Sequence, residues 1–206
     1  MDDGSTDKSV ENIPTYPNIP DKRTIKVIRL IKNQGECSAS DTGFRSASGK
    51  YTCRLSADDY FIRDDHIEKQ VKEMDRTGAD WCYNTITDTG ASCKIPTTVY
   101  SKWLIHPVFD NLILKFPSIC RFIISKRNPV NSSALMFRAD AYWKHSLAWS
   151  IHKTRYGCDL AILDQALNLG LKGLALHEKG SFYRIHSGQL SNNPEFIKEM
   201  ERRRSR

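Results

Sequence analysis

The first ninety residues alternate between strand-like and helix-like segments, and this order constrains the fold more than any other feature of the sequence. Thr24–Leu30 is rich in β-branched residues, Tyr51–Leu55 is a shorter strand-like run, and Asp80–Ile86 is a third. Helical periodicity follows each of the first two. This alternation predicts an α/β fold with a mixed, mainly parallel sheet, helices on both faces and ligand-binding loops at the carboxyl ends of the strands.

The two helical segments are bounded by residues that favour helix ends. After Cys37, apolar and small residues fall on one helical face, and Gly49 is expected to close this helix in a left-handed conformation. The second helix follows Asp64 and Asp65, which can cap a helix N-terminus, and it closes near Gly78. The predicted order is therefore strand, helix, strand, helix, strand.

The C-terminal half continues the pattern after a less regular region. Residues 88–128 lack a clear period and contain prolines, which indicates irregular structure and short helices where acceptor-specific features are expected. Ser133–Arg138 is predicted as a buried strand, and residues 160–170 as a helix with an apolar stripe that ends at its glycine. Leu171–Leu176 and Ser181–Ile185 are predicted as two further strands.

Charge is concentrated at one end of the chain. The 206 residues carry a formal net charge of +7, and four of the positive charges are Arg202, Arg203, Arg204 and Arg206. The rest of the chain is only mildly basic, so residues 192–206 are expected to form a basic, solvated tail, and no nucleic-acid partner is expected. The six cysteines include no C-x-x-C pair, which favours a reducing compartment over a disulfide framework or a zinc site.

Hydropathy gives no signal for insertion into a membrane. No basic start followed by an apolar stretch opens the sequence, so no signal peptide is predicted. The longest apolar region, Trp103–Ile124, is interrupted by charges and prolines and falls short of a span of about 20 apolar residues. We therefore expect a cytoplasmic location, with peripheral contact at the cytoplasmic face of the membrane as a further possibility.

Two acidic turns are the strongest candidates for chemistry. Asp58 and Asp59 follow a strand-like run, and adjacent carboxylates on a turn suit Mg²⁺ or Mn²⁺ shared with a diphosphate. Taken alone, such a pair equally well ends a strand and caps a helix. The second turn, DDGSTD at residues 2–7, also has an ordinary explanation in turn and cap formation.

The order of motifs between and beyond these turns resembles that of the family 2 glycosyltransferases. Those domains carry a D-D-G-S-x-D turn, an N-x-G loop, an A-x-G-x-Y strand, a D-x-D-type motif, an acidic E-D motif and a Y-R-x-H segment followed by a serine. The corresponding segments here are DDGSTD, NQG at 33–35, ASGKY at 47–51, SADDY at 56–60, Cys158 with Asp159, and YRIH at 183–186 followed by Ser191. The resemblance implies a GT-A fold and a catalytic domain at residues 1–191.

The resemblance also implies roles for individual residues. Asp3 would recognise the nucleotide base, Asp2 and Ser5 would shape the turn, and Asp159 would be the general base. Asp58, together with Asp59, would ligate Mn²⁺ or Mg²⁺ at the donor diphosphate. The full set implied for nucleotide-sugar binding is Asp2, Asp3, Ser5, Asn33, Gly35, Ser56, Asp58, Arg184 and His186. A UDP-sugar is the expected donor, and a glycan, lipid or protein is the expected acceptor.

Three departures from the family pattern bear on activity. Ser56 stands where the acidic turn of the family begins with a carboxylate, and Ala39-Ser40-Asp41 replaces a segment that carries an arginine. The strand and helix that precede the D-D-G-S turn in the family are not in this sequence.

Two other interpretations remain open. The domain could retain the fold and donor binding without turnover, or it could be a basic module that binds nucleic acid or a membrane surface. The second predicts salt-dependent binding that disappears when Arg202–Arg206 is deleted.

Overall fold

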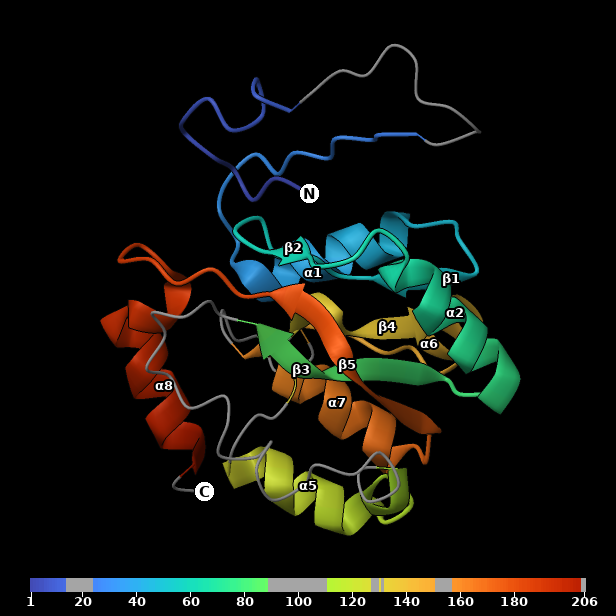
Figure 1. The fold of residues 1–206 in the computed structure, drawn as a ribbon. Helices are drawn as coiled ribbons and strands as arrows, with labels where there is room; N and C mark the ends of the chain where they lie inside the picture. The colour runs from blue at the N-terminus through green and yellow to red at the C-terminus, as the bar shows by residue number, and fades with distance from the viewer. Residues whose placement is uncertain (14–23, 89–110, 127–129, 131, 151–156, 205–206) are drawn as a thin grey trace.

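A five-stranded mixed sheet forms the centre of the protein (Figure 1). The computed structural model describes residues 1–13, 24–88, 111–126, 130, 132–150 and 157–204. The strands are β1 (Tyr51–Cys53), β2 (Tyr60–Phe61), β3 (Trp81–Asp88), β4 (Met136–Arg138) and β5 (Gly173–Phe182), in the spatial order β1-β4-β3-β5-β2. The long β3–β5 pair is parallel, and the short β1–β4, β3–β4 and β2–β5 pairs are antiparallel. The predicted mixed α/β sheet is confirmed, although parallel pairing among the described strands is limited to one pair and is less extensive than predicted.

Helices cover both faces of this sheet, as predicted. They are α1 (Glu36–Ser46), α2 (His66–Thr77), α5 (Pro117–Lys126), α6 (Ala139–Lys144), α7 (Cys158–Asn168) and α8 (Pro194–Arg204), with the 3₁₀ turns η1 (Ser132–Ala134) and η2 (Leu190–Asn192). In Figure 1, α7 and then α5 lie in successive layers below the sheet. The N-terminal segment, here residues 1–13 and 24–31, lies on the opposite side of the molecule.

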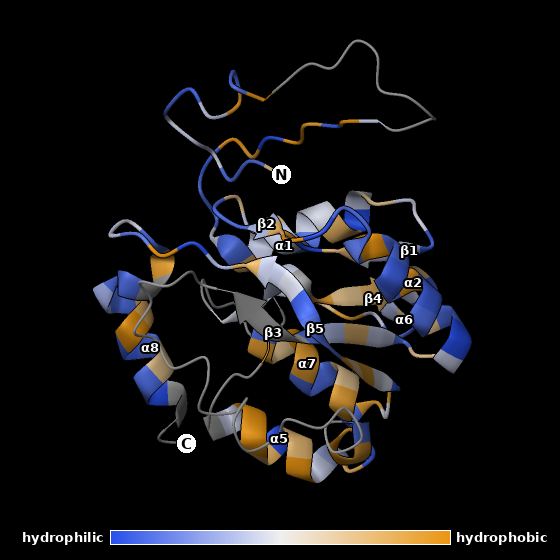
Figure 2. Ribbon diagram, viewed as in Figure 1, coloured by the Kyte–Doolittle hydropathy of each residue, from blue (hydrophilic) through white to orange (hydrophobic). Residues whose placement is uncertain are grey.

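The two-residue period of the strands divides the core into two clusters. Trp81 and Phe137 pack with residues of α1 and α7 on one face of the sheet, whereas Cys82 and Met136 pack with Met74 of α2 on the other. Apolar residues accordingly mark α7 and α5 in Figure 2, while α2 exposes a largely hydrophilic surface. The sheet is therefore buried on both sides, which fixes the loops that leave its strands.

The segment predicted as the first strand does not become one. Among the described residues, its strand-type pairing consists of a single bridge between Asp2 and Arg29, in which the Asp2 N–H donates to the Ile28 carbonyl at 2.8 Å. Ile25 and Val27 remain exposed. A β-branched run favours an extended chain, but a strand also requires continuous hydrogen bonding to a neighbour.

Glycine signals located two of the three helix ends correctly. Gly78 takes the left-handed conformation directly after α2, and Gly170 does the same after α7. The prediction for Gly49 was wrong, because α1 ends at Ser46 and Ala47 is already extended. Asp65 occupies the N-cap position of α2 without capping it.

Three predictions for the C-terminal half need correction, and one for residues 88–128 is partly tested. Leu171–Leu176 and Ser181–Ile185 belong largely to the single strand β5, which continues through register shifts against β3. The strand predicted from Ser133 begins at Met136, because residues 132–134 form η1. The predicted solvated tail contains the helix α8. The region 88–128 was predicted to hold irregular structure and short helices, and it includes the short helix α5, although residues 89–110 lie outside the described part of the chain.

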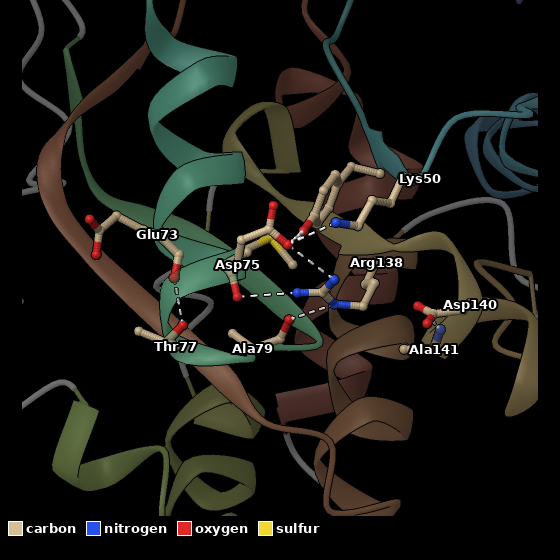
Figure 3. A network of polar contacts seen from close by, with 10 residues as sticks. Lys50, Glu73, Asp75, Thr77, Ala79, Arg138, Asp140 and Ala141 are labelled. Carbon is tan, nitrogen blue, oxygen red and sulfur yellow. Dashed lines mark hydrogen bonds and ion pairs between the residues drawn. The ribbon is translucent and has the colours of Figure 1, made fainter.

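A polar network fixes the C-terminal end of α2 to the sheet (Figure 3). The Asp75 carboxylate accepts hydrogen bonds from Tyr51 and from Lys50 Nζ at 2.9 Å, and these contacts lower its pKa to about 2. The Arg138 guanidinium donates to the carbonyl of Met74, in the last turn of α2, and to that of Ala79, just beyond the helix. The helix that follows the acidic turn is therefore anchored at its far end.

Candidate active site

The N-terminal turn is closed by its own side chains. Asp2 Oδ1 accepts hydrogen bonds from the backbone N–H of Ser5, at 3.1 Å, and from its hydroxyl. The hydrogen bond from the Ser5 hydroxyl is the main reason that the pKa of Asp2 lies below its usual value. Arg29 Nε lies 3.2 Å from Asp2 Oδ2 and forms an ion pair without hydrogen-bond geometry. Asp2 and Ser5 thus close the turn, and their part in nucleotide binding stays a prediction.

Asp3 joins this turn to the loop that precedes α1. Its two carboxylate oxygens accept the backbone N–H groups of Gln34 and Gly35, each at 2.8 Å. Gly4 has a φ of +74°, and a Cβ there would lie 2.8 Å from the Asn33 nitrogen. Only glycine fits this approach. The two predicted nucleotide-binding segments therefore lie together, and the role of Asp3 toward a base remains a prediction.

Asp58 and His186 bring the second acidic turn together with the C-terminal motif. His186 Nε2 lies 3.2 Å from Asp58 Oδ2, although the residues are 128 positions apart in the sequence. Both side chains are exposed, with 39% of Asp58 and 41% of His186 accessible to solvent. The pair therefore places one oxygen and one nitrogen, both able to ligate a metal ion, on an exposed surface.

Asp59 lies in a different environment from its neighbour. It is buried and accepts hydrogen bonds from the Ser133 hydroxyl at 2.6 Å and from the Arg184 N–H at 3.2 Å. Burial raises the pKa of the Asp59 carboxyl, and these hydrogen bonds act in the opposite direction. The Ser133 oxygen also accepts the Ser56 N–H at 3.1 Å. Ser133, which the sequence analysis did not single out, thus holds both ends of the acidic turn.

Asp159 lies in the first turn of α7, as expected from its place before the apolar stripe. Gly157 precedes the helix in a left-handed conformation, and the Leu160 N–H donates to Asp159 Oδ1 at 2.9 Å. A carboxylate at this position is stabilised by the unpaired N–H groups and by the positive end of the helix dipole. The half-buried Asp159 side chain is thereby held at one end of a rigid element.

Arg54 is a second residue that the sequence analysis missed. Its guanidinium forms an ion pair with Glu36 in the first turn of α1 and donates to Cys158 Sγ at 3.4 Å. Burial of the guanidinium disfavours its charge, but the neighbouring negative groups, with Glu36 first, outweigh this and raise the pKa of Arg54. No local motif marks this arginine, because its partners lie far away in the sequence.

The predicted site residues form two connected groups. One consists of the N-terminal turn and the loop before α1, and the other consists of the acidic turn with residues 184–186. Arg54 contacts α1 and the first turn of α7, so it links the first group to the turn that carries Asp159.

Comparison with protein families identifies this combination of turns. Residues 1–135 match the sequence model described as Glycosyl transferase family 2. The chain belongs to glycosyl transferase family 2. The match includes both acidic turns of this family 2 domain, and the YRIH segment lies beyond it.

Curated relatives of the family 2 domain are uncharacterized glycosyltransferases. One from Haemophilus influenzae (strain ATCC 51907 / DSM 11121 / KW20 / Rd) is 27% identical over 93% of this chain and 57% of its own length. Another from the same organism is 44% identical over 36% of this chain and 28% of its own length. The chain thus spans little more than half of the relative that it matches along most of its length.

Solved structures with the same fold include the S. aureus protein TarS. TarS 1–349 superposes with a TM-score of 0.65 at 15% identity, covering 99% of this chain and 53% of that one. Its complex with UDP-GlcNAc superposes with a TM-score of 0.62 at 14% identity, covering 98% of this chain and 55% of that one. These likenesses confirm the predicted GT-A fold of the family 2 domain. Within the residues that the structure describes, no helix is both long enough and apolar enough to span a bilayer.

Proposed function

We propose that this protein transfers a sugar from a UDP-sugar to an acceptor hydroxyl, with inversion at the anomeric carbon and with a divalent cation. The observation that carries the proposal is the exposed Asp58–His186 pair, held beside a buried Asp59 that fixes the turn. Family membership supports transferase chemistry. The TarS complexes with UDP and UDP-GlcNAc support the donor class by fold likeness.

The donor atoms of this pair fit Mn²⁺ or Mg²⁺. Asp58 supplies a carboxylate oxygen, the ligand type that both ions accept, and His186 supplies an imidazole nitrogen that suits Mn²⁺ better. No group of three or more histidine, cysteine or acidic side chains able to hold a metal occurs in the described part of the chain, so phosphate oxygens and water would complete the coordination. A bound divalent cation would offset the negative charge that develops on the leaving diphosphate.

Asp159 is the proposed general base. The carboxylate takes the proton from the incoming acceptor hydroxyl as the oxygen attacks the anomeric carbon and the bond to the diphosphate breaks. One displacement assisted by one base inverts the configuration at that carbon. The hydrogen bond from Leu160 to Oδ1 orients the carboxylate for this role.

The acceptor is a glycan, a lipid or a protein, and we include peripheral membrane contact in the proposal. Phe116, Ile119 and Phe122 are exposed along α5 and the turn before it. An apolar stripe of this kind, next to Lys115, suits an anionic lipid surface.

Donor binding without turnover is the alternative, and Ser56 is the observation that favours it. The turn begins with a serine, whose N–H is bound by Ser133, where the family pattern has a further carboxylate. This alternative keeps the Asp58–His186 pair for donor binding. It predicts that UDP release stays at the background level, whether or not Asp159 is replaced.

A thermal-shift panel of uridine, guanosine and thymidine diphosphates, each with and without Mn²⁺, tests the binding part of the proposal. We expect UDP with Mn²⁺ to raise the melting temperature by several degrees, because a ligand at about 100 times its Kd stabilises the native state by about 2.7 kcal/mol. Asp58→Asn should remove the Mn²⁺-dependent part of the shift. Asp64→Asn, at an exposed acid of the following loop, is the matched control.

Release of UDP from UDP-N-acetylglucosamine tests turnover. Asp159→Asn should keep the thermal shift and lower the rate of UDP release by about 100-fold or more, because general base catalysis contributes factors of this order. Equal rates before and after this substitution contradict the assignment of Asp159. The absence of a shift with all three nucleotides contradicts the proposed function.

A further inference from the structure

Arg54 lies where three elements of the site meet. It directly follows β1, forms an ion pair with Glu36 at the start of α1, and donates from Nη1 to Cys158 Sγ at the start of α7. Its guanidinium also lies over the ring of Trp149, 5.5 Å from the centroid. The side chain is 14% exposed, so its position is set by these contacts and much less by solvent.

Charged and titratable groups of several elements interact electrostatically with Arg54. Glu36 belongs to α1, Cys158 and Asp159 belong to α7, and Asp59 belongs to the acidic turn. A largely buried charge interacts more strongly with its neighbours than a charge in water, because the effective dielectric constant is lower. The positive charge of Arg54 therefore acts on the general base of the proposed reaction as well as on the turn that carries Asp58.

Stability alone does not explain this arrangement. Removing a guanidinium and a carboxylate from water costs free energy, and buried ion pairs are often replaceable by apolar side chains without loss of stability. A guanidinium differs from an apolar side chain, and from lysine, because its rigid fork can donate in two directions at once. Here the two directions lead to the first turns of two helices.

A continuous series of contacts runs through this fork. Asp3 holds the N–H of Gly35, which immediately precedes Glu36, and Cys158 immediately precedes Asp159. We propose that Arg54 is a positioning residue, which holds the first turn of α7 against the first turn of α1. It thereby fixes Asp159 relative to the loop at residues 33–35, called the donor-side loop below. This inference rests on the proposed function only in so far as Asp159 is the base.

Kinetics of UDP release from UDP-N-acetylglucosamine provide the first test. Arg54→Met should lower kcat on the order of 10- to 100-fold, since small displacements of a reacting group cost this much, and KM should change by less than about twofold. Loss of the positive charge of Arg54 also favours protonation of Asp159, so the acid limb of the pH–rate profile should move to higher pH. Arg54→Lys restores the charge and should return the acid limb, while kcat recovers only in part because the fork is lost.

Two further variants test the direction of the pH shift and provide a control for loss of an arginine. Glu36→Gln removes the negative partner of Arg54, so its charge acts on Asp159 without opposition and the acid limb should move to lower pH. Arg76→Met removes a comparable arginine that pairs with Glu73 on the exposed face of α2. It should leave kcat and the pH profile unchanged.

Hydrogen exchange of the folded variants gives a readout that does not depend on activity. Peptides that cover residues 36–40 and 158–162 should exchange faster in Arg54→Met than in the unmodified protein or in Arg76→Met, because the two helix starts are no longer held together. Unchanged exchange in these peptides overturns the inference, as does an acid limb that stays in place. If the unmodified protein releases no UDP, the proposed function fails, and exchange alone then decides whether Arg54 fixes the start of α7.

Discussion

His66 is the most completely buried titratable side chain next to the acidic turn. It begins α2, and its ring is stacked on that of Phe61 with 4.5 Å between centroids. Neither ring nitrogen has a hydrogen-bond partner within the part of the chain described. Burial lowers the pKa of His66, and the charges of Glu178 and Asp65 only partly oppose this effect. The native state therefore favours the neutral ring that supports strand β2.

This preference predicts a loss of stability in mild acid. Below the usual pKa of 6.5, the unfolded chain binds a proton that the native state resists until its own, lower pKa, so the free energy of unfolding falls as pH falls through this window. His66→Phe keeps a ring against Phe61 and should remove that part of the loss. Urea unfolding midpoints at about pH 7.5 and about pH 5 measure it.

The control for this prediction is His145→Asn, at a partly buried histidine that follows α6. It should keep the pH dependence of the unmodified protein. A His66→Phe protein that loses as much stability in acid as the unmodified one contradicts the prediction.

The roles of single residues were only partly predictable from sequence. Asp58 and Asp59 are chemically identical neighbours, and their local sequence gives no reason to separate them. The difference arises from Ser133 and Arg184, which lie 74 and 125 positions from Asp59 and bury its carboxylate. Asp58 faces His186 instead. A motif can thus locate a turn, but long-range contacts decide which of its side chains remains available.

At the scale of elements, the parallel pair β3–β5 depends on a close approach between two residues in register. Trp81 lies opposite Gly173, and a Cβ on Gly173 would lie 2.5 Å from Trp81 Cζ2. The indole Nε1 donates to the Leu171 carbonyl at 3.3 Å, which holds the ring across the start of β5. Glycine is therefore required by the neighbouring ring, and the loss of a strand side chain is offset by burial of the tryptophan.

This contact predicts a coupled pair of substitutions. Gly173→Ala should destabilise the protein by about 1–3 kcal/mol through overpacking. Trp81→Phe removes the ring atoms nearest to the added methyl group, so the cost of Gly173→Ala should be smaller in that background, with a coupling of about 0.5 kcal/mol or more. Denaturant unfolding of the two single variants and the double variant measures the coupling. Additive free energies would show that the ring is not the cause.

Elements defined by local signals were predicted best. Helices α2 and α7 have an apolar period and a left-handed glycine after the last turn, and both formed as expected. Thr24–Leu30 has the composition of a strand, but pairing is not a local property, and it forms one bridge only. The continuity of β5 could not be predicted because its register shifts depend on how it meets β3.

At the scale of the whole molecule, the order of motifs was more informative than any single one. It predicted the GT-A fold and the family, and the structure brings two residues of its motifs, Asp58 and His186, to within 3.2 Å of each other. It did not predict the antiparallel pairing of β4 with β1 and β3, because sheet order is set by long-range packing. Nor did it find Arg54, whose partners come from two helices that are distant in sequence.

Helix α5 is apolar on two sides, and within the described part of the chain only one of them is covered. Cys120 and Ile124 are buried in the core cluster that includes α7, whereas Ile119 and Phe122 are exposed, in line with Phe116 in the preceding turn. A contiguous exposed apolar stripe is a candidate interaction surface. Helix α5 lies on the side of the molecule away from the N-terminal segment (Figure 1), so a membrane at α5 would leave the donor-side loop accessible.

Co-sedimentation with vesicles that contain phosphatidylserine tests this surface. Each exposed aromatic or aliphatic side chain contributes up to roughly 1.5–3 kcal/mol when buried, so replacing Phe116, Ile119 and Phe122 together by serine should weaken binding by about tenfold or more. Ile31→Ser is the matched control, because Ile31 is fully exposed in the N-terminal segment on the opposite side. Equal vesicle binding by the triple variant and the unmodified protein shows that the stripe does not face the membrane. Failure of the unmodified protein to bind removes membrane contact from the proposed function and leaves the donor site unaffected.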